Sequence, residues 1–249
     1  MTSANPTWSS PPESLMISKG QLHVWRADLD LPEACLTRLH LVLSPEEMDR
    51  AKRFYFPKDR DRFIVSHACV RDVLSGYLQV KPEQIKFITN SFGKPALAAD
   101  YEGKDLEFNL SHSNRFALLA VSQGMRVGVD VEFIRMVFGG VEIARRFFSP
   151  SEVQALLSLP TELQSEAFFR CWTRKEAYIK GKGRGLSLPL DEFDVSVLPG
   201  EPAALLNTRP DPGDATRWSM FQVDPAPGYS GTVAVEGHSM ELNYWEWVP

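Results

Sequence analysis

The order of helical and strand-like patterns along the chain nearly repeats, and this constrains the fold more than any single motif. Each half sets helical runs beside a small group of strand-like runs, and the break near residues 124–128 divides the 249 residues almost evenly. No residue-by-residue repeat accompanies the pattern. We therefore expect an α+β fold, or α/β with mostly antiparallel sheet, with subdomains at 1–126 and 127–249.

Hydrophobic periodicity locates the elements within these halves. A capping box that begins at Ser44 starts one helix, and Pro57 separates it from a second helix that closes near residue 78. In the second half a helix restarts at Ser149, and another over 164–181 ends with Gly181 as its stop. Alternation predicts strands over 21–29, 106–122, 126–134, 193–198, 217–223, 229–237 and 240–248, and a strand followed by a turn over 85–97.

Composition narrows the class of protein. A net charge of −5 argues against nucleic-acid binding, which usually requires a basic surplus. No apolar run approaches the roughly 20 residues that a membrane span needs. Three cysteines without a CxxC pair predict reduced thiols in a cytoplasmic protein. The first residues, up to about position 14, are rich in Pro and Ser, resemble no signal peptide, and are expected to be loose.

The strand-like run "GVDVE" at 128–132 carries two carboxylates. Side chains alternate along a strand, so Asp130 and Glu132 share a face and lie roughly 6.6 Å apart along it. Two carboxylates on one face repel each other unless a proton or a cation separates them, and their oxygens suit Mg²⁺ or Mn²⁺. The alternative is an ordinary amphipathic edge strand.

The predicted helix over 164–181 contributes a third carboxylate. Trp172, Glu176 and Lys180 are spaced four residues apart and form one stripe on the helix surface. Packing of this helix beside the "GVDVE" strand would add Glu176 to the pair and complete a Mg²⁺ site. The alternative is an exposed Glu176–Lys180 ion pair.

Basic and polar residues elsewhere allow two interpretations. Arg50 and Arg53 fall on one predicted helical face and would either clamp phosphate oxygens or join a solvated, salt-bridged helix. Lys94 sits in the turn of "FGKPAL", and Ser111 and His112 end the strand-like "FNLSHS". The positions of Lys182 and Arg184 after the helix fit either phosphate or solvent. No spacing of the histidines indicates a zinc site.

These motifs together resemble the Sfp-type 4′-phosphopantetheinyl transferases. The chain matches the family signature W-x-x-K-E-A-x-x-K at Trp172, Lys175, Glu176, Ala177 and Lys180. Five further motifs occur in the family's order over roughly residues 40–200. They are "SPEEMDRAKRFYF", "FGKPAL", "FNLSHS", "GVDVE" and "ARRFFSPSE".

The resemblance implies a pseudo-dimer of two similar subdomains with the active site in the cleft between them. A transferase of this kind moves the 4′-phosphopantetheine arm of coenzyme A to a serine of an apo acyl or peptidyl carrier protein and releases adenosine 3′,5′-bisphosphate. The implied metal ligands, for Mg²⁺ or alternatively Mn²⁺, are Asp130, Glu132 and Glu176. The implied coenzyme A contacts are Arg50, Arg53, Lys94, Ser111, His112, Lys175 and Lys180.

The resemblance also implies roles in the reaction. Glu176 would accept the serine proton, while Lys180 and His112 would neutralise phosphate charge, and Lys175 would position the leaving phosphate. Glu47 stands where some relatives have a lysine, which affects the expected binding of the 3′-phosphate. We expect a cytoplasmic monomer that serves fatty acid, polyketide or nonribosomal peptide carriers. The residues also fit another Mg²⁺-dependent phosphoryl enzyme or a non-catalytic module that binds coenzyme A or a carrier.

Overall fold

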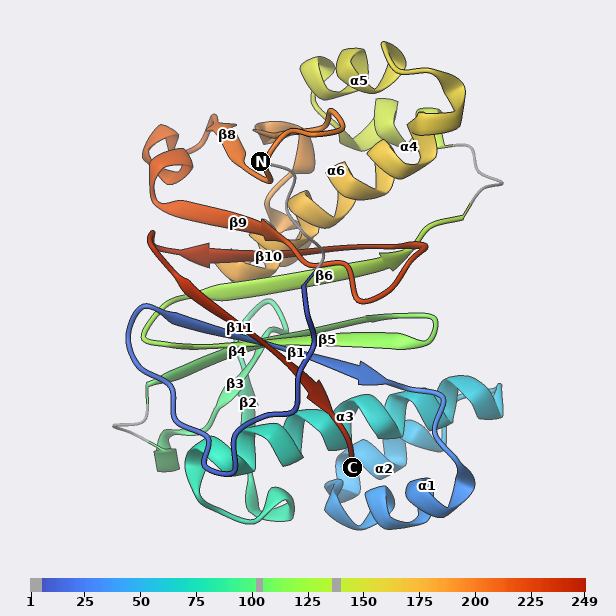
Figure 1. The fold of residues 1–249 in the computed structure, drawn as a ribbon, viewed down its shortest axis with the longest axis vertical. Coiled ribbons are helices and arrows are strands. Elements are labelled where there is room, and N and C mark those ends of the chain that lie inside the picture. Colours follow the sequence, from blue (N-terminus) through green and yellow to red (C-terminus); the bar gives the residue numbers. More distant parts are fainter. Residues whose placement is uncertain (1–5, 102–104, 136–139) are drawn as a thin grey trace.

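The structure is a computed structural model that describes residues 6–101, 105–135 and 140–249. It is a mixed α+β fold in which two sheets lie between two groups of helices (Figure 1). The first sheet has the strand order β11-β1-β5-β4 and is covered by α1, α2 and α3 at the bottom of the view. The second has the order β6-β10-β9 and lies below α4, α5 and α6.

The bounds of the elements follow the predicted order. The helices are α1 (Glu33–Leu39), α2 (Pro45–Ala51), α3 (Pro57–Leu78), α4 (Gly140–Phe147), α5 (Pro150–Leu157) and α6 (Thr161–Lys182). The strands up to the chain's midpoint are β1 (Gln21–Asp28), β2 (Phe87–Thr89), β3 (Pro95–Leu97), β4 (Leu106–Ser113), β5 (Phe116–Gln123) and β6 (Val127–Phe133). The later strands are β7 (Phe193–Val195), β8 (Leu205–Thr208), β9 (Trp218–Gln222), β10 (Tyr229–Glu236) and β11 (Glu241–Trp247).

The two halves repeat one topology, as the order of patterns in the sequence predicted. Strands β1, β5 and β4 form an antiparallel sheet in that order, and β6, β10 and β9 form another in the corresponding order. Each half also has one long helix, α3 or α6, and both are 22 residues long. The chain is therefore built from two similar subdomains.

A buried ion pair recurs at the same place in each subdomain. Ser44 caps α2 in a capping box with Glu47, and Ser149 caps α5 in a capping box with Glu152. Each glutamate then pairs with a buried cation at the same point along the long helix. Glu47 meets Arg71 of α3 at 2.7 Å, and Glu152 meets Lys175 of α6 at 2.7 Å. The repeat therefore extends from topology to individual side-chain contacts.

The last strand crosses from the second subdomain into the first. Strand β11 pairs in parallel with β1, from Gln21 opposite Glu241 to Ala27 opposite Trp247. This corrects the predicted boundary, because residues 241–247 belong to the first sheet. The expected loose N-terminus is also partly wrong, since Ser9 bridges to β11 and Trp8 packs on Tyr244 at 5.7 Å between ring centroids. Residues 1–5 lie outside the described residues.

Two glycines let α6 lie directly against β6. A Cβ on Gly128 would come within 2.1 Å of the Ala177 carbonyl oxygen and 2.2 Å of the Gly181 nitrogen. A Cβ on Gly181 would meet the Trp218 ring at 2.6 Å. Gly181 therefore lies inside the helix, and the predicted helix stop is wrong. Gly183, with φ of 67°, is the actual C-cap.

Apolar clusters fill the space on both sides of the sheets. One lies between α3 and the first sheet, a second surrounds α6, and a third joins β1 and β5 to β6 and β10. The third cluster contains Val127, Val129 and Val131, which form the face of β6 opposite to its carboxylates. Among the described residues, no helix is long and apolar enough to cross a membrane.

Replacing Gly128 by Ala should lower the free energy of unfolding by about 3 kcal/mol or more, because the new methyl group meets backbone atoms that cannot rotate away. Gly200→Ala is the matched control. Gly200 lies in an exposed turn with no atom near its missing Cβ, so it should cost only about 1 kcal/mol of left-handed backbone strain. Urea denaturation of both variants checks this, and equal losses would contradict the close approach of α6.

Candidate active site

The candidate site lies where β6 and α6 of the second subdomain meet β4 of the first. Asp130 projects from the middle of β6, and its Oδ1 accepts from Lys180 Nζ of α6 at 2.6 Å and from Ser111 Oγ of β4 at 2.9 Å. Lys180 Nζ also donates to Ser111 Oγ at 3.1 Å. Three elements from both subdomains thus converge on one carboxylate.

The three predicted carboxylates act on one another. Burial, followed by the charges of Asp130 and Glu132, raises the pKa of Glu176 to about 7, against the opposing effect of Lys180. Burial also raises the pKa of Asp130, and burial together with the charge of Asp130 raises that of Glu132. Asp130 and Glu132 thus influence the carboxyl group of Glu176 electrostatically.

A divalent cation fits this set of donors. Asp130 Oδ2 is buried and has no hydrogen-bond partner in the part of the chain that the structure describes, so this oxygen is available to bind a cation. Carboxylate oxygens are the ligands that Mg²⁺ and Mn²⁺ prefer. Among the described residues no three metal-ligating side chains converge to metal-binding distance, and the carboxylate has Lys180 as its partner instead. Asp130, Glu132 and Glu176 are the residues that would hold the ion.

A row of polar side chains on β4 joins the subdomains at this point. Asn109, Ser111 and Ser113 alternate along the strand and share one face. Asn109 Oδ1 accepts from Val129 N at 2.8 Å, Ser111 Oγ from Val131 N at 3.4 Å, and Ser113 Oγ from Phe133 N at 3.1 Å. The prediction included Ser111 but missed Asn109 and Ser113. Their period of two within "FNLSHS" was the available signal.

His112 points to the opposite face of β4 from Ser111. His112 is exposed at the protein surface, but desolvation by the surrounding protein atoms, then the charges of Lys180, Arg50 and Arg62, lower the pKa of its imidazole. His112 thus lies within electrostatic reach of both Lys180 and Arg50. A phosphate placed among these groups would favour the charged imidazole.

Arg50 borders a cleft of about 350 Å³ on the first subdomain. Its guanidinium lies over the Phe63 ring at 5.2 Å, and His67 stacks on the same ring with centroids 3.8 Å apart. Arg53 is exposed and lies beyond the end of α2 at Ala51, so the predicted shared helical face is wrong. The cleft combines apolar walls with charged residues of both signs, since Glu46 and Glu47 line it together with Arg50.

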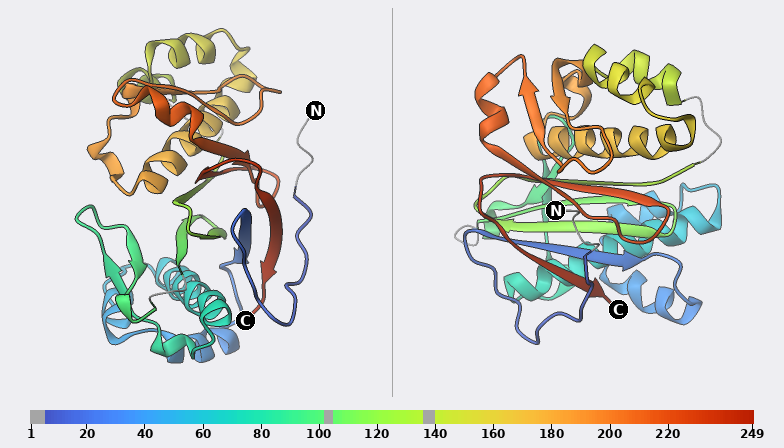
Figure 2. Two further views of the ribbon diagram at one scale, coloured as in Figure 1. Left: turned by 90° about the vertical axis from the view of Figure 1, so that its left-hand side faces the viewer. Right: turned by 45° about the horizontal axis from the view of Figure 1, so that its top comes forward.

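Lys94 connects the β2–β3 hairpin to the second subdomain. Its Nζ donates to the carbonyl oxygens of Val127 at 3.0 Å and Gly181 at 3.4 Å. Asn90 Nδ2 in the same turn donates to Gly183 O at 2.8 Å. The hairpin therefore reaches from the first subdomain to the end of α6, as Figure 2 shows on the left. Lys94 holds backbone oxygens here rather than facing the carboxylates.

Lys175 does not contribute to the site, which corrects the predicted phosphate contact. Its side chain is fully buried, pairs with Glu152 and donates to the carbonyl oxygens of Leu190 and Phe193, each at 2.7 Å. Neighbouring residues on a helix point in directions about 100° apart. Lys175 therefore faces the core of its own subdomain, and Glu176 points in a different direction.

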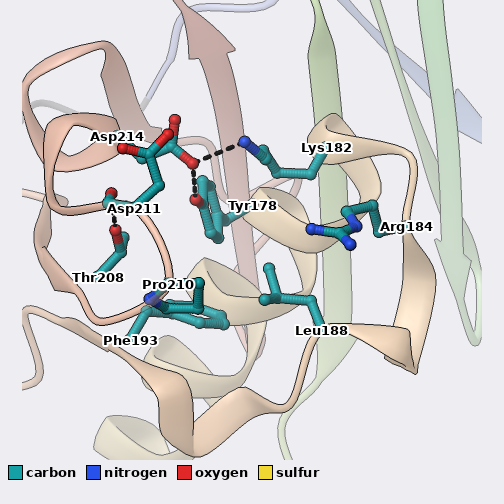
Figure 3. A pocket seen from close by; sticks show the side chains of 9 residues that line it. All are labelled: Tyr178, Lys182, Arg184, Leu188, Phe193, Thr208, Pro210, Asp211 and Asp214. Atoms are coloured by element: carbon teal, nitrogen blue, oxygen red, sulfur yellow. Dashed lines mark hydrogen bonds and ion pairs between the residues drawn. The ribbon is translucent and has the colours of Figure 1, made fainter.

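Lys182 and Arg184 line a separate pocket of about 140 Å³ (Figure 3). Lys182 Nζ donates to Asp214 Oδ2 at 2.6 Å, and Tyr178 Oη donates to the same oxygen at 2.5 Å. None of the predicted metal ligands lines this pocket. Lys182 is therefore an ion-pair partner of Asp214 and not a member of the carboxylate site.

The amino-acid sequence of this chain is similar to those of known proteins. A family profile described as the 4′-phosphopantetheinyl transferase superfamily matches residues 126–234, and one described as 4′-phosphopantetheinyl transferase, N-terminal, matches residues 32–124. The chain is 39% identical over 97% of its length to the 4′-phosphopantetheinyl transferase HetI of a Nostoc species, of which it covers 98%. It is 34% identical over 79% of its length to the 4′-phosphopantetheinyl transferase Sfp of Bacillus subtilis, of which it covers 83%.

One solved structure is also similar, at a lower level. It is the holo-(acyl-carrier-protein) synthase of Thermotoga maritima, which matches 45% of this chain and 62% of its own at 20% identity. The TM-score of 0.36 is too low to support an argument about the site.

Glu176 should make the stability of the metal-free protein depend on pH. Its pKa is about 7 in the folded chain and near 4.5 when unfolded, so the folded chain binds more protons between these values. The free energy of unfolding should therefore fall as pH rises through this window, by roughly 1–3 kcal/mol more than in Glu176→Gln. Urea unfolding in chelator at about pH 5 and pH 8 measures the difference. Equal pH dependence in both proteins would refute the assignment.

Lys175→Met should cost about 3–5 kcal/mol of stability, because it leaves Glu152 buried without its cation. The folded fraction should bind Mg²⁺ as the wild type does, because Lys175 lies outside the carboxylate site. Adding Glu152→Gln should recover part of the stability. Chemical denaturation and metal titration test both points, and a selective loss of metal binding would restore Lys175 to the site.

Proposed function

The chain belongs to the 4′-phosphopantetheinyl transferase superfamily, and from this premise we propose that it transfers the 4′-phosphopantetheine group of coenzyme A to a serine of an apo carrier protein. Adenosine 3′,5′-bisphosphate is the second product. The observation that supports the site assignment is the ion pair of Lys180 with the buried Asp130, whose other oxygen has no hydrogen-bond partner among the described residues and whose charge raises the pKa of Glu176.

The carboxylates fit Mg²⁺, with Mn²⁺ as the alternative, which when bound would neutralise charge on the pyrophosphate of coenzyme A. Lys180 already lies against Asp130, so its ammonium is in place to meet a phosphate oxygen at the same site. This places a fixed positive charge where negative charge develops in the transition state. Burial alone would lower the pKa of Lys180, but Asp130, Glu176 and Glu132 raise it overall and keep it charged.

The transfer itself needs one proton acceptor and no covalent enzyme intermediate. The carrier serine oxygen forms a bond to the phosphorus of the phosphopantetheine group, and the bond from that phosphorus to the bridging oxygen breaks. The serine proton passes to the carboxylate of Glu176, directly or through a water. A carboxylate placed within reach of the serine hydroxyl, directly or through one water, can act as such a general base.

The nucleotide end of coenzyme A is proposed to lie along the first subdomain. Ser111, beside Lys180, and His112, on the other face of β4, are the proposed contacts of the phosphates, and Arg50 and Arg53 are those of the 3′-phosphate. Lys94 would reach coenzyme A only by leaving its carbonyl partners. Glu47, where some relatives are expected to have a lysine, instead pairs with Arg71 at 2.7 Å and contributes no positive charge.

The setting of the reaction follows from the chain as a whole. We propose acyl or peptidyl carriers of fatty acid, polyketide or nonribosomal peptide synthesis as partners, in the cytoplasm, where the free thiols of Cys35, Cys69 and Cys171 stay reduced. Both subdomains already supply the site, so the protein should act as a monomer. Light scattering that gave an obligate oligomer would overturn that part of the proposal.

Glu176→Gln should lower transfer at least about 100-fold while the chain stays folded, because the amide can neither accept the serine proton nor hold a cation well. The measurement is the mass of apo acyl and peptidyl carriers after incubation with coenzyme A, Mg²⁺ and the protein. Glu166→Gln is the matched control, because Glu166 lies exposed on the same helix and pairs only with Arg170 among the described contacts.

Three results would count against this assignment. Near-normal turnover of Glu176→Gln would remove the residue from its proposed roles. Release of inorganic phosphate without a mass gain on any carrier would indicate a phosphoryl hydrolase. Tight binding of coenzyme A without Mg²⁺ dependence or transfer would indicate a non-catalytic module.

A further inference from the structure

The row of side chains on β4 forms a repeating unit with β6. Each serine accepts a hydrogen bond from one backbone N–H of β6 and donates to the carboxylate one residue earlier. Ser111 accepts from Val131 N and donates to Asp130 Oδ1 at 2.9 Å. Ser113 accepts from Phe133 N and donates to Glu132 Oε2 at 2.8 Å. The serines thus bind both the backbone and the acidic side chains of the other subdomain.

We propose that Ser113 is a positioning residue that holds Glu132 in its metal-binding orientation and fixes the register between the two subdomains. The inference rests on the proposed role of Glu132 as a metal ligand. Ser113 belongs to the first subdomain and Glu132 to the second, so the site is assembled only when the subdomains are docked in this register.

The chemistry of a hydroxyl group makes this arrangement directional. A serine has one proton to donate, and its remaining capacity is to accept. Because Ser113 Oγ accepts from Phe133 N at 3.1 Å, its proton is directed to Glu132 Oε2. The backbone of β6 therefore fixes the hydroxyl, and the hydroxyl fixes one oxygen of the glutamate. The other oxygen is left in a defined place for a cation.

The same contacts fix the register of β4 relative to β6. Side chains of β4 reach β6 at Val129, Val131 and Phe133, which are successive N–H groups on one edge of the strand. A slip of two residues would place Ser113 opposite Val131 and leave Glu132 without its donor. Groups that orient a metal ligand in this way typically contribute 10–100-fold to metal affinity.

Ser113 permits a cleaner test than Ser111. The Ser111 hydroxyl also accepts from Lys180 Nζ at 3.1 Å, so its removal would disturb the proposed phosphate contact as well. Among the described residues, the Ser113 hydroxyl forms hydrogen bonds only with Glu132 and the backbone of Phe133. Ser122→Ala is the matched control, because Ser122 is a buried serine of β5 that donates to Met125 O at 2.6 Å, away from the carboxylates.

The experiment titrates the full-length protein with Mg²⁺, and separately Mn²⁺, by calorimetry without coenzyme A. Ser113→Ala should bind the ion about 10–100-fold more weakly than the wild type, whereas Ser113→Thr, which restores a hydroxyl, and Ser122→Ala should bind within about threefold. In the transfer assay Ser113→Ala should need more Mg²⁺ for half-maximal rate, and saturating metal should recover most of kcat.

The outcomes separate this inference from the proposed function. Ser113→Ala with wild-type metal affinity would overturn the positioning role and leave the transferase assignment intact. Failure of Ser113→Thr to recover affinity would also overturn it, because the effect would then not come from the hydroxyl. Metal binding that weakens as expected in a protein that transfers nothing would support the positioning role and refute the proposed function.

Discussion

Hydrogen bonds between side chains of β4 and the backbone of β6 are the contact on which the rest of the site depends. The two sheets are separate as backbone ladders, and Asn109, Ser111 and Ser113 take the place of a strand partner at their junction. A row of short polar side chains satisfies buried N–H groups and still leaves hydroxyl protons for carboxylates. The same atoms therefore join the subdomains and orient the acidic groups.

The repeat between the halves explains why neighbouring residues of α6 behave so differently. Lys175 occupies the position that Arg71 occupies in α3, and both are buried against a glutamate and two backbone carbonyls. The next residue is acidic in both helices. Asp72 accepts from the indole of Trp247 at 2.7 Å, whereas Glu176 faces Asp130. The exposed carboxylate of Asp72 thus binds the C-terminal strand, whereas Glu176 is the proposed general base and metal ligand.

Local patterns were sufficient to select the candidate carboxylates but not to predict their surroundings. A period of two placed Asp130 and Glu132 on one face of a strand, and a spacing of four placed Glu176 and Lys180 in one stripe of a helix. Each pair could therefore be predicted from the sequence of a single element. Whether Lys175 faced solvent or core depended on Glu152, which comes from another helix. A glycine after a lysine is compatible with a helix end and also with a close contact inside a helix. Gly181 is of the second kind, because it lies against Gly128 and Trp218, which come from other parts of the sequence. Similarly, nothing within residues 241–247 specifies β1 as their neighbour.

Because β11 pairs with β1, the two subdomains are not separate halves of the sequence. The second half of the sequence carries the strand that covers the open edge of the first half's sheet, beside residues 8 and 9 (Figure 1). A chain divided at its sequence midpoint would yield one piece with an uncovered hydrogen-bonding edge and one with a strand that has no sheet to join. The two repeats are thus no longer interchangeable modules. Separating them would require a new neighbour for β11 and a new cover for the free edge of β1.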